Sequence, residues 1–476
     1  MKKLYRFSAI ALLVLPLVFT SCSDYLDRDD DDNITEADVF ARYEKVNGLV
    51  SDVYAAAKKA DRPLVFFEHF SNSAITDECE GTNVEGNITN NFNNGAWNPN
   101  SLPGSVGQYW EALYEGIRKA NLIIENVQKY NTPDNPQQDG DLRNRIGEMY
   151  FMRGYFHMLL LRMYGEAPYI DRVINAGDNM DFKKESVHSM VEKIVTDAQT
   201  AYGMVPNKYV KTSENFGRVD KGACLGLISF VRWVAATPLW NGASQYGYNL
   251  RRVFENEYAY DATRWRKAKE AAKAVLDFEV GGTKRYSLYT KHDANDFKDP
   301  ADGNLNDSRV YARLWDMFYD MDAFANEYVF FMTKSKDQAW QGDIYPPSRE
   351  GSSRQQPVQE QVDEYEYIVG DYGYPVYSAE ARKGGYDDTN PYVKGTRDPR
   401  FYRDVIYHGA PYRNNKNESK TINTASGSDK IGATNATTTG YYLRKFQQES
   451  WNKSGNFSIN APAIWRLPEF IYIYAE

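Results

Sequence analysis

Apolar side chains recur with helical spacing over the first two thirds of the chain. Between residues 46 and 57 they fall at offsets 0, 3, 4, 7, 8 and 11, which is the pattern of one face of an amphipathic helix. Gly165 and Pro168 follow another such run and favour a helix end there. The same spacing predicts further helices over 110–127, 149–163, 186–202, 219–236 and 263–278.

Several of these helices resemble tetratricopeptide helices, in which small residues sit at close crossings and large ones lie between them. The pattern is carried by Ala223, Gly226, Leu227 and Phe230, and again by Trp265, Ala268, Ala272 and Val275. The spacing is not a regular 34 residues, so we expect degenerate helical repeats with insertions. The predicted fold class is mainly α, a tetratricopeptide-like scaffold with a large, irregular, loop-rich ligand region.

Two stretches differ from this helical pattern. Residues 72–107 are rich in Asn and Gly, and residues 293–460 carry Gly, Pro, Ser, Thr and Tyr with little sustained periodicity. Loops this long are usually functional or disordered, and their aromatic content argues against disorder. Within them, residues 426–440 have low complexity and are expected to form a mobile loop.

The N-terminus has the layout of a secretory signal. Lys2, Lys3 and Arg6 precede an apolar run over 9–19, which is too short to span a bilayer comfortably. Small residues then lead to Cys22, so we predict a signal peptide over 1–21 and acylation of the Cys22 thiol. Ordinary cleavage, with Cys22 as a bystander, is the alternative. An acidic, solvated tether over 22–34 and a single domain over 35–476 would follow.

Charge and cysteine content exclude several classes of protein. The formal charge is −9, and because residues 1–21 contribute +3, the chain after the signal carries about −12. An acidic chain without a basic stripe is a poor ligand for nucleic acid or for an anionic membrane surface. Only Cys79 and Cys224 remain after Cys22, too few for a disulfide framework. We expect two unpaired thiols, since Cys224 falls in a helical apolar pattern; pairing in an oxidising compartment is the alternative.

No known catalytic or cofactor motif is present. The chain lacks H-E-x-x-H, G-x-S-x-G, a Walker loop and G-x-G-x-x-G, so we assign no catalytic residue and no cofactor. A cluster of oxygen donors offers a possible calcium site, although a glycine misplaced for an EF-hand favours a solvated turn instead. The cluster comprises Asp299, Asp302, Asn304, Asn306 and Asp307.

Aromatic residues supply the candidate ligand site. The chain has 37 Tyr, 23 Phe and 9 Trp, which suits surfaces that are partly apolar and partly hydrogen-bonding. Trp97 and Trp340 lie in segments with no helical or strand period to bury them, so we predict that they face a ligand. Trp315 and Tyr319 are one helical turn apart and would extend the same platform, or pack in a core.

Asp77 and Glu78 are the carboxylates to consider first, because they stand beside the Asn- and Gly-rich loop. We place Asp77 in the ligand site as an acceptor for hydroxyl groups. An acid and base pair at glycosidase separation is the competing interpretation.

Short motifs along the whole chain resemble the SusD/RagB-type lipoproteins. The chain after the signal begins with CSDYLD, and residues 147–168 read GEMYFMRGYFHMLLLRMYGEAP, similar to the family's signature helix. The motifs QEQVDEYEY, DPRFYRDVIYHG and TGYYLRKF follow in the family's order, and WRLPEFIYIYAE resembles its C-terminal helix. Most of these are structural marks, so Arg153, Arg466 and Glu469 are interpreted as framework residues.

The resemblance implies a binding protein at the outer face of an outer membrane. Family members cap a SusC-like TonB-dependent transporter and hand it oligosaccharides or other polymers, through ligand contacts that vary between members. The competing hypotheses are an exported α-helical glycoside hydrolase and a purely structural adaptor of the transporter complex. Because family chains continue past the last motif, we also expect that this sequence is truncated after Glu476.

Overall fold

The computed structural model describes most of the chain from residue 34 onward. The described ranges are 34–60, 71–82, 88–96, 104–130, 136–209, 215–242, 254–290, 317–318, 320–332, 342–393, 395–413, 419–447 and 463–476. The predicted signal peptide, the Cys22 acylation site and nearly all of the acidic tether lie outside these residues.

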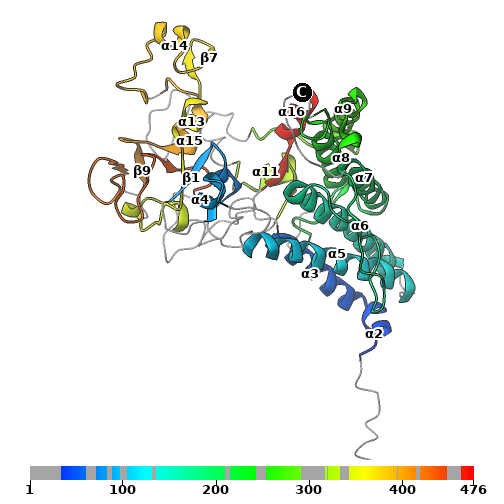
Figure 1. The fold of residues 1–476 in the computed structure, drawn as a ribbon. Coiled ribbons are helices and arrows are strands. Elements are labelled where there is room, and N and C mark those ends of the chain that lie inside the picture. The colour runs from blue at the N-terminus through cyan, green and yellow to red at the C-terminus, as the bar shows by residue number, and fades with distance from the viewer. Residues whose placement is uncertain are drawn as a thin grey trace, which may run out of the picture.

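Long helices follow one another along one side of the molecule (Figure 1). Each packs mainly on the next, and the C-terminal helix α16 packs on α9. The mainly helical scaffold is therefore confirmed, while the tetratricopeptide pairing stays a prediction. The helices on this side are α2 (Glu36–Phe40), α3 (Tyr43–Ala60), α5 (Gly104–Tyr130), α6 (Pro136–Tyr164), α7 (Val187–Met204), α8 (Lys221–Ala236), α9 (Ala262–Leu276) and α16 (Leu467–Ala475).

Helix ends follow local sequence. Ser186 caps α7 and Asp220 caps α8, each accepting a hydrogen bond from a backbone N–H of the first turn. α6 ends as predicted at Gly165, which has a φ of +70° and donates its N–H to the Leu161 carbonyl. The start of α5 was missed, because residues 104–107, which we assigned to the irregular stretch, form its first turn.

The second lobe is built of short elements, which lie on the other side of the molecule (Figure 1). Its short helices are η4 (Asn72–Ile75), α4 (Ile88–Asn93), η7 (Pro347–Arg349), α13 (Gln359–Asp363), α14 (Ala379–Lys383) and α15 (Pro399–Asp404). Its antiparallel strand pairs are β1 (Cys79–Gly81) with β5 (Gln355–Pro357), β6 (Tyr367–Val369) with β7 (Tyr372–Tyr374), β8 (Val405–Ile406) with β11 (Tyr442–Leu443), and β9 (Pro411–Arg413) with β10 (Ser419–Thr421).

One strand pair joins the C-terminal segment to the helical lobe. β4 (Tyr328–Phe331) pairs with β12 (Ala463–Arg466), and Phe330, Trp465 and Phe470 enter the main core. The remaining described elements are η6 (Glu255–Tyr258), the hairpin β2 (Glu279–Val280) with β3 (Thr283–Lys284), and α11 (Met321–Asn326).

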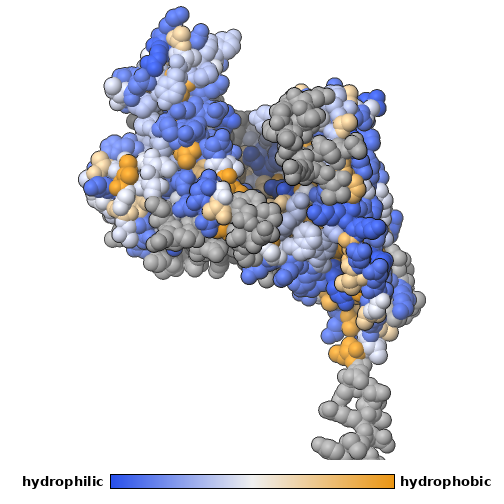
Figure 2. Space-filling model, viewed as in Figure 1, coloured by the Kyte–Doolittle hydropathy of each residue, from blue (hydrophilic) through white to orange (hydrophobic). Residues whose placement is uncertain are grey.

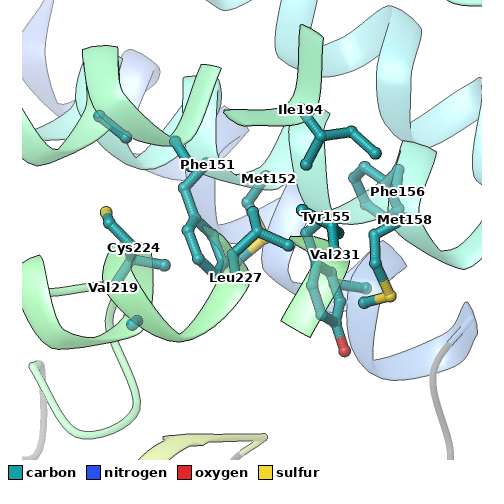
Figure 3. Close-up of a cluster of buried hydrophobic side chains, with 14 of the residues drawn as sticks. Phe151, Met152, Tyr155, Phe156, Met158, Ile194, Val219, Cys224, Leu227 and Val231 are labelled. Atoms are coloured by element: carbon teal, nitrogen blue, oxygen red, sulfur yellow. The ribbon is translucent and has the colours of Figure 1, made fainter. Parts of the chain in front are cut away.

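The main core lies between the long helices. Figure 3 shows side chains of α6, α7 and α8 that converge there, among them Phe151, Ile194 and Leu227. Cys224 is fully buried in this cluster, whereas Cys79 lies in the second lobe on β1, and both thiols are free. This agrees with the expectation of two unpaired cysteines.

The second lobe has its own core, which is rich in tyrosine. Tyr412 donates its hydroxyl to Gln447, Tyr442 donates to the Asp429 carbonyl at 2.8 Å, and both rings are buried. Tyrosine thus supplies apolar area together with a donor that needs a partner, as the composition indicated. On the face seen in Figure 2 the surface is mainly hydrophilic, and its apolar patches are small.

The low-complexity stretch 426–440 borders this core, with most of its side chains exposed. Thr437 is fully buried, and the Thr438 hydroxyl donates to Gln356 of β5 at 3.1 Å. These contacts attach part of the stretch to β5, and its mobility stays a prediction.

Candidate functional site

A long-range strand pair organises the candidate site. β1 follows the Asp77–Glu78 turn and pairs with β5, so that Cys79 lies opposite Pro357. The Val358 N–H donates to the Glu78 carbonyl at 3.3 Å and extends the pairing to the turn. Two irregular stretches that are far apart in the sequence therefore meet at this point.

A cavity of about 340 Å³ opens beside this strand pair. Its walls come from η4 and the turn before β1, from β5 and α13, from the junction of α15 with β8, and from the end of β11. The residues that line it are Ser71, Ser73, Glu78, Cys79, Gln355, Pro357, Gln361, Tyr365, Asp404, Val405, Leu443, Lys445 and Phe446. Its size falls within the range of small-molecule sites, about 300 to 1,000 Å³.

Asp404 is fixed in the cavity wall by a buried ion pair. Arg403 holds both carboxylate oxygens with its Nε and Nη2, and the Tyr365 hydroxyl donates to Oδ2 at 2.9 Å. Burial works to raise the pKa of Asp404, but the Arg403 charge and these hydrogen bonds outweigh it and hold the pKa below its ordinary value. Asp404 is therefore a stable anion whose oxygens are already in use.

Lys445 brings an amine to the same cavity. Burial lowers the pKa of Lys445, and the Asp404 carboxylate opposes this change. Within the described part of the chain the Lys445 amine has no hydrogen bond or ion pair, since Asp404 is already held by Arg403. The ammonium group is thus available to a ligand in the cavity.

Most of the predicted site residues fall outside the described ranges. This holds for Trp97, Trp315, Tyr319 and Trp340, and these assignments stay predictions. Asp77 is described and is exposed in the turn before β1, but Glu78, and not Asp77, is among the cavity-lining residues. The expected calcium cluster over 299–307 also lies outside the described residues.

The described residues next to the predicted tryptophans contact elements near the cavity. Before Trp97, Asn93 donates its side-chain amide to the Ala74 carbonyl at 3.1 Å. After Trp315, the Phe318 ring lies 4.5 Å from Phe446, a cavity-lining residue.

The segment after Trp340 reaches the same region from another direction. Asp343 accepts a hydrogen bond at 2.6 Å from the N–H of Arg354, next to β5. Three separate segments thus approach one region of the second lobe.

Of the described cavity residues, sequence reasoning had named only Glu78 as a candidate. Tyr365, Asp404 and Lys445 belong to the motifs QEQVDEYEY, DPRFYRDVIYHG and TGYYLRKF, which we had interpreted as structural marks. Gln355 stands outside these motifs, and no local signal distinguishes it.

The residues interpreted as framework do connect elements of the fold. Arg153 on α6 is 7% exposed and holds Asp197 of α7 with two hydrogen bonds, at 2.8 and 2.5 Å. Arg466 pairs with Glu327 at 3.1 Å, and Glu469 accepts the Arg466 backbone N–H at the start of α16. None of the three lines the cavity.

Two further features are absent from the residues that the structure describes. They contain no group of three His, Cys, Asp or Glu side chains that could hold a metal ion. In the same ranges no helix combines the length and the apolar character needed to cross a membrane.

Comparison with known proteins identifies the family. Residues 24–231 match a family described as starch-binding and associating with the outer membrane, and residues 321–476 match the SusD family. A SusD-like protein P2 from Formosa agariphila is 24% identical over 202 residues, which are 42% of this chain and 38% of that protein, well short of its full length.

Solved structures show the same fold. A SusD-like protein from Bacteroides fragilis superposes with a TM-score of 0.66 at 18% identity, covering 95% of this chain and 76% of the other. A laminarin-binding SusD-like protein superposes with a TM-score of 0.56 at 15% identity, covering 91% and 79%. Together with the ordered motifs, these matches place the chain in the SusD/RagB family of carbohydrate-binding proteins.

Proposed function

We propose that this protein captures oligosaccharide or polysaccharide at the cell surface and delivers it to a SusC-like TonB-dependent transporter. The observation that carries the proposal is the cavity beside β1 and β5, which combines charged and amide groups with the aromatic side chains of Tyr365 and Phe446. Sugars match such a lining, because their C–H faces pack on rings and their hydroxyls meet polar groups. The family assignment supports the same class of ligand.

Attachment to the outer membrane is the second part of the proposal. Cys22 would be acylated after removal of residues 1–21, with 22–34 as a tether and 35–476 as one domain. Two acyl chains are needed for stable anchoring, and lipoprotein processing supplies them. Membership of a family that associates with the outer membrane supports this placement.

We infer binding without hydrolysis from the chemistry of the cavity carboxylates. A glycosidase needs a protonated carboxylic acid opposite a second carboxylate. Asp404 does not meet the first requirement, since Arg403 and Tyr365 keep its pKa low and occupy its oxygens. Glu78 is exposed, and Asp404, the other carboxylate among the described cavity residues, is already bound by Arg403 and Tyr365.

A glycan array with the mature protein tests the proposal, followed by chromatography of each bound glycan for products. We expect binding of at least one glycan, with no shortening of the chain. Trp97→Ala and Trp340→Ala should each weaken binding, with circular dichroism as the folding control. Failure to bind any glycan would contradict the proposed function, and product release abolished by Glu78→Gln would favour the hydrolase.

A further inference from the structure

The cavity is small compared with the polymers that the proposed function involves. Its 340 Å³ stand near the lower limit of the range for small-molecule sites. This volume holds a small ligand, and an end or branch residue of a polymer can enter it without the rest of the chain.

Gln355 carries an unused donor in the cavity wall. Its side-chain oxygen accepts hydrogen bonds from the Ser71 N–H at 2.9 Å and from the Ser71 hydroxyl at 2.8 Å. Among the described residues its amide nitrogen has no partner, and the residue is only 1% exposed. A buried donor without a partner costs free energy, and a small side-chain shift toward the cavity would let a ligand oxygen recover that cost.

Two opposite charges face the cavity without pairing. Lys445 and Glu78 both line it, and the Glu78 carboxylate acts on Lys445 electrostatically. Among the described residues neither side chain takes part in an ion pair. A group placed between them must accept from the ammonium and donate to the carboxylate. Hydroxyl groups do both, which neither a carboxylate nor an amine does alone.

An apolar ring completes the cavity wall. Phe446 has a φ of +65°, a backbone conformation that residues other than glycine rarely adopt. Its ring packs edge-on against Phe318 with centroids 4.5 Å apart. The Lys445 ammonium lies over this ring, 5.3 Å from its centroid, so an amine and an aromatic ring stand together in the cavity wall.

We propose that this cavity is a subsite for one terminal or branching sugar residue. Lys445 and Gln355 donate to its hydroxyl or ring oxygens, Glu78 accepts from a hydroxyl, and Phe446 contacts its apolar face. The inference rests on the proposed function and deepens it. The protein recognises its glycan by an end or a branch, and the rest of the polymer stays outside the cavity.

The stoichiometry of the wild-type protein tests this directly. Starch, laminarin, mannan and xylan are each titrated by calorimetry as fractions of defined chain length and branching, together with their trisaccharides. For each polymer that binds, the number of protein molecules bound per polymer chain should increase with the number of ends and branches. For linear polymers this number should not change with chain length. A number that rises with linear length would overturn the inference and leave glycan binding standing. If none of the four polymers binds, the result contradicts both the proposed function and this inference.

Matched variants test the named contacts. Lys445→Met and Glu78→Gln should each weaken binding of the trisaccharide about tenfold to a hundredfold, the effect of losing one charged hydrogen bond. Lys430→Met and Glu360→Gln, which change exposed side chains of the same lobe, should leave affinity unchanged. Thermal unfolding reports whether each variant is folded. Wild-type affinity in folded Lys445→Met and Glu78→Gln would overturn the assignment.

Discussion

Removal of the Arg153 guanidinium should destabilise the helical lobe more than any change at an exposed ion pair. Arg153 is buried on α6 and holds Asp197 of α7 through two hydrogen bonds. Its Nη1 also donates to Asn121 of α5 at 2.9 Å and to the Asp171 carbonyl at 2.8 Å. One side chain thus connects three consecutive helices.

The expected cost follows from what the change leaves behind. Arg153→Met keeps an apolar stem of similar reach but leaves the Asp197 carboxylate buried without its cation. Among the described residues, only the Tyr169 hydroxyl, at 2.7 Å, still donates to it. Breaking one side of a buried ion pair costs about 3–5 kcal/mol. That is a large share of a typical free energy of unfolding, about 5–15 kcal/mol.

Urea unfolding followed by circular dichroism and by tryptophan fluorescence measures this free energy. The double variant Arg153→Met, Asp197→Leu should lose less than the single variant, because no unpaired charge stays buried. Arg232→Met is the matched control, since it breaks a partly exposed pair with Glu192 and should cost about 1 kcal/mol or less. If Arg153→Met costs no more than Arg232→Met, or if the double variant is the least stable, the reasoning is wrong.

Three further predictions concern packing, pH and anchoring. An alanine Cβ at Gly116 would come within 2.9 Å of the Phe156 ring, whereas at Gly154 the nearest atoms lie at 3.5 Å. Gly116→Ala should therefore lower the free energy of unfolding by about 1–3 kcal/mol. Gly154→Ala should leave it unchanged or raise it by up to about 1 kcal/mol. Equal urea midpoints for the two variants would contradict this. Burial raises the pKa of Glu469 from 4.5 to about 7, so the unfolded state loses this proton at lower pH than the folded state does. The free energy of unfolding should therefore fall as pH rises from 4.5 to about 7. The Glu469→Gln variant should lack this fall, and parallel pH profiles of variant and wild type would refute the assignment. Cys22→Ala should release the exported protein from the membrane fraction, and a variant that stays bound in high salt would exclude the lipid anchor.

The helical lobe could be predicted from local sequence patterns. The periodicity over 46–57 and 219–236 and the stop at Gly165 are local signals, because a helix satisfies its hydrogen bonds within a few residues of each position. The order of the short motifs could also be read from the sequence, since a motif is a property of the linear chain. The structure confirmed the helices, and the family matches confirmed the assignment that the motifs indicated.

The position of the cavity depends on contacts between distant segments, which local sequence patterns do not predict. β1 and β5 are each three residues long and have no period of their own, and they form because distant segments meet. Folding brings Glu78 beside Gln355 and Lys445 in the cavity wall, although hundreds of residues separate Glu78 from the other two. Asp77 shows the same limit, because its neighbour Glu78 has a similar local sequence yet is the one that lines the cavity. Burial and unpaired charge depend on what packs around a group, and neither can be read from spacing along the chain.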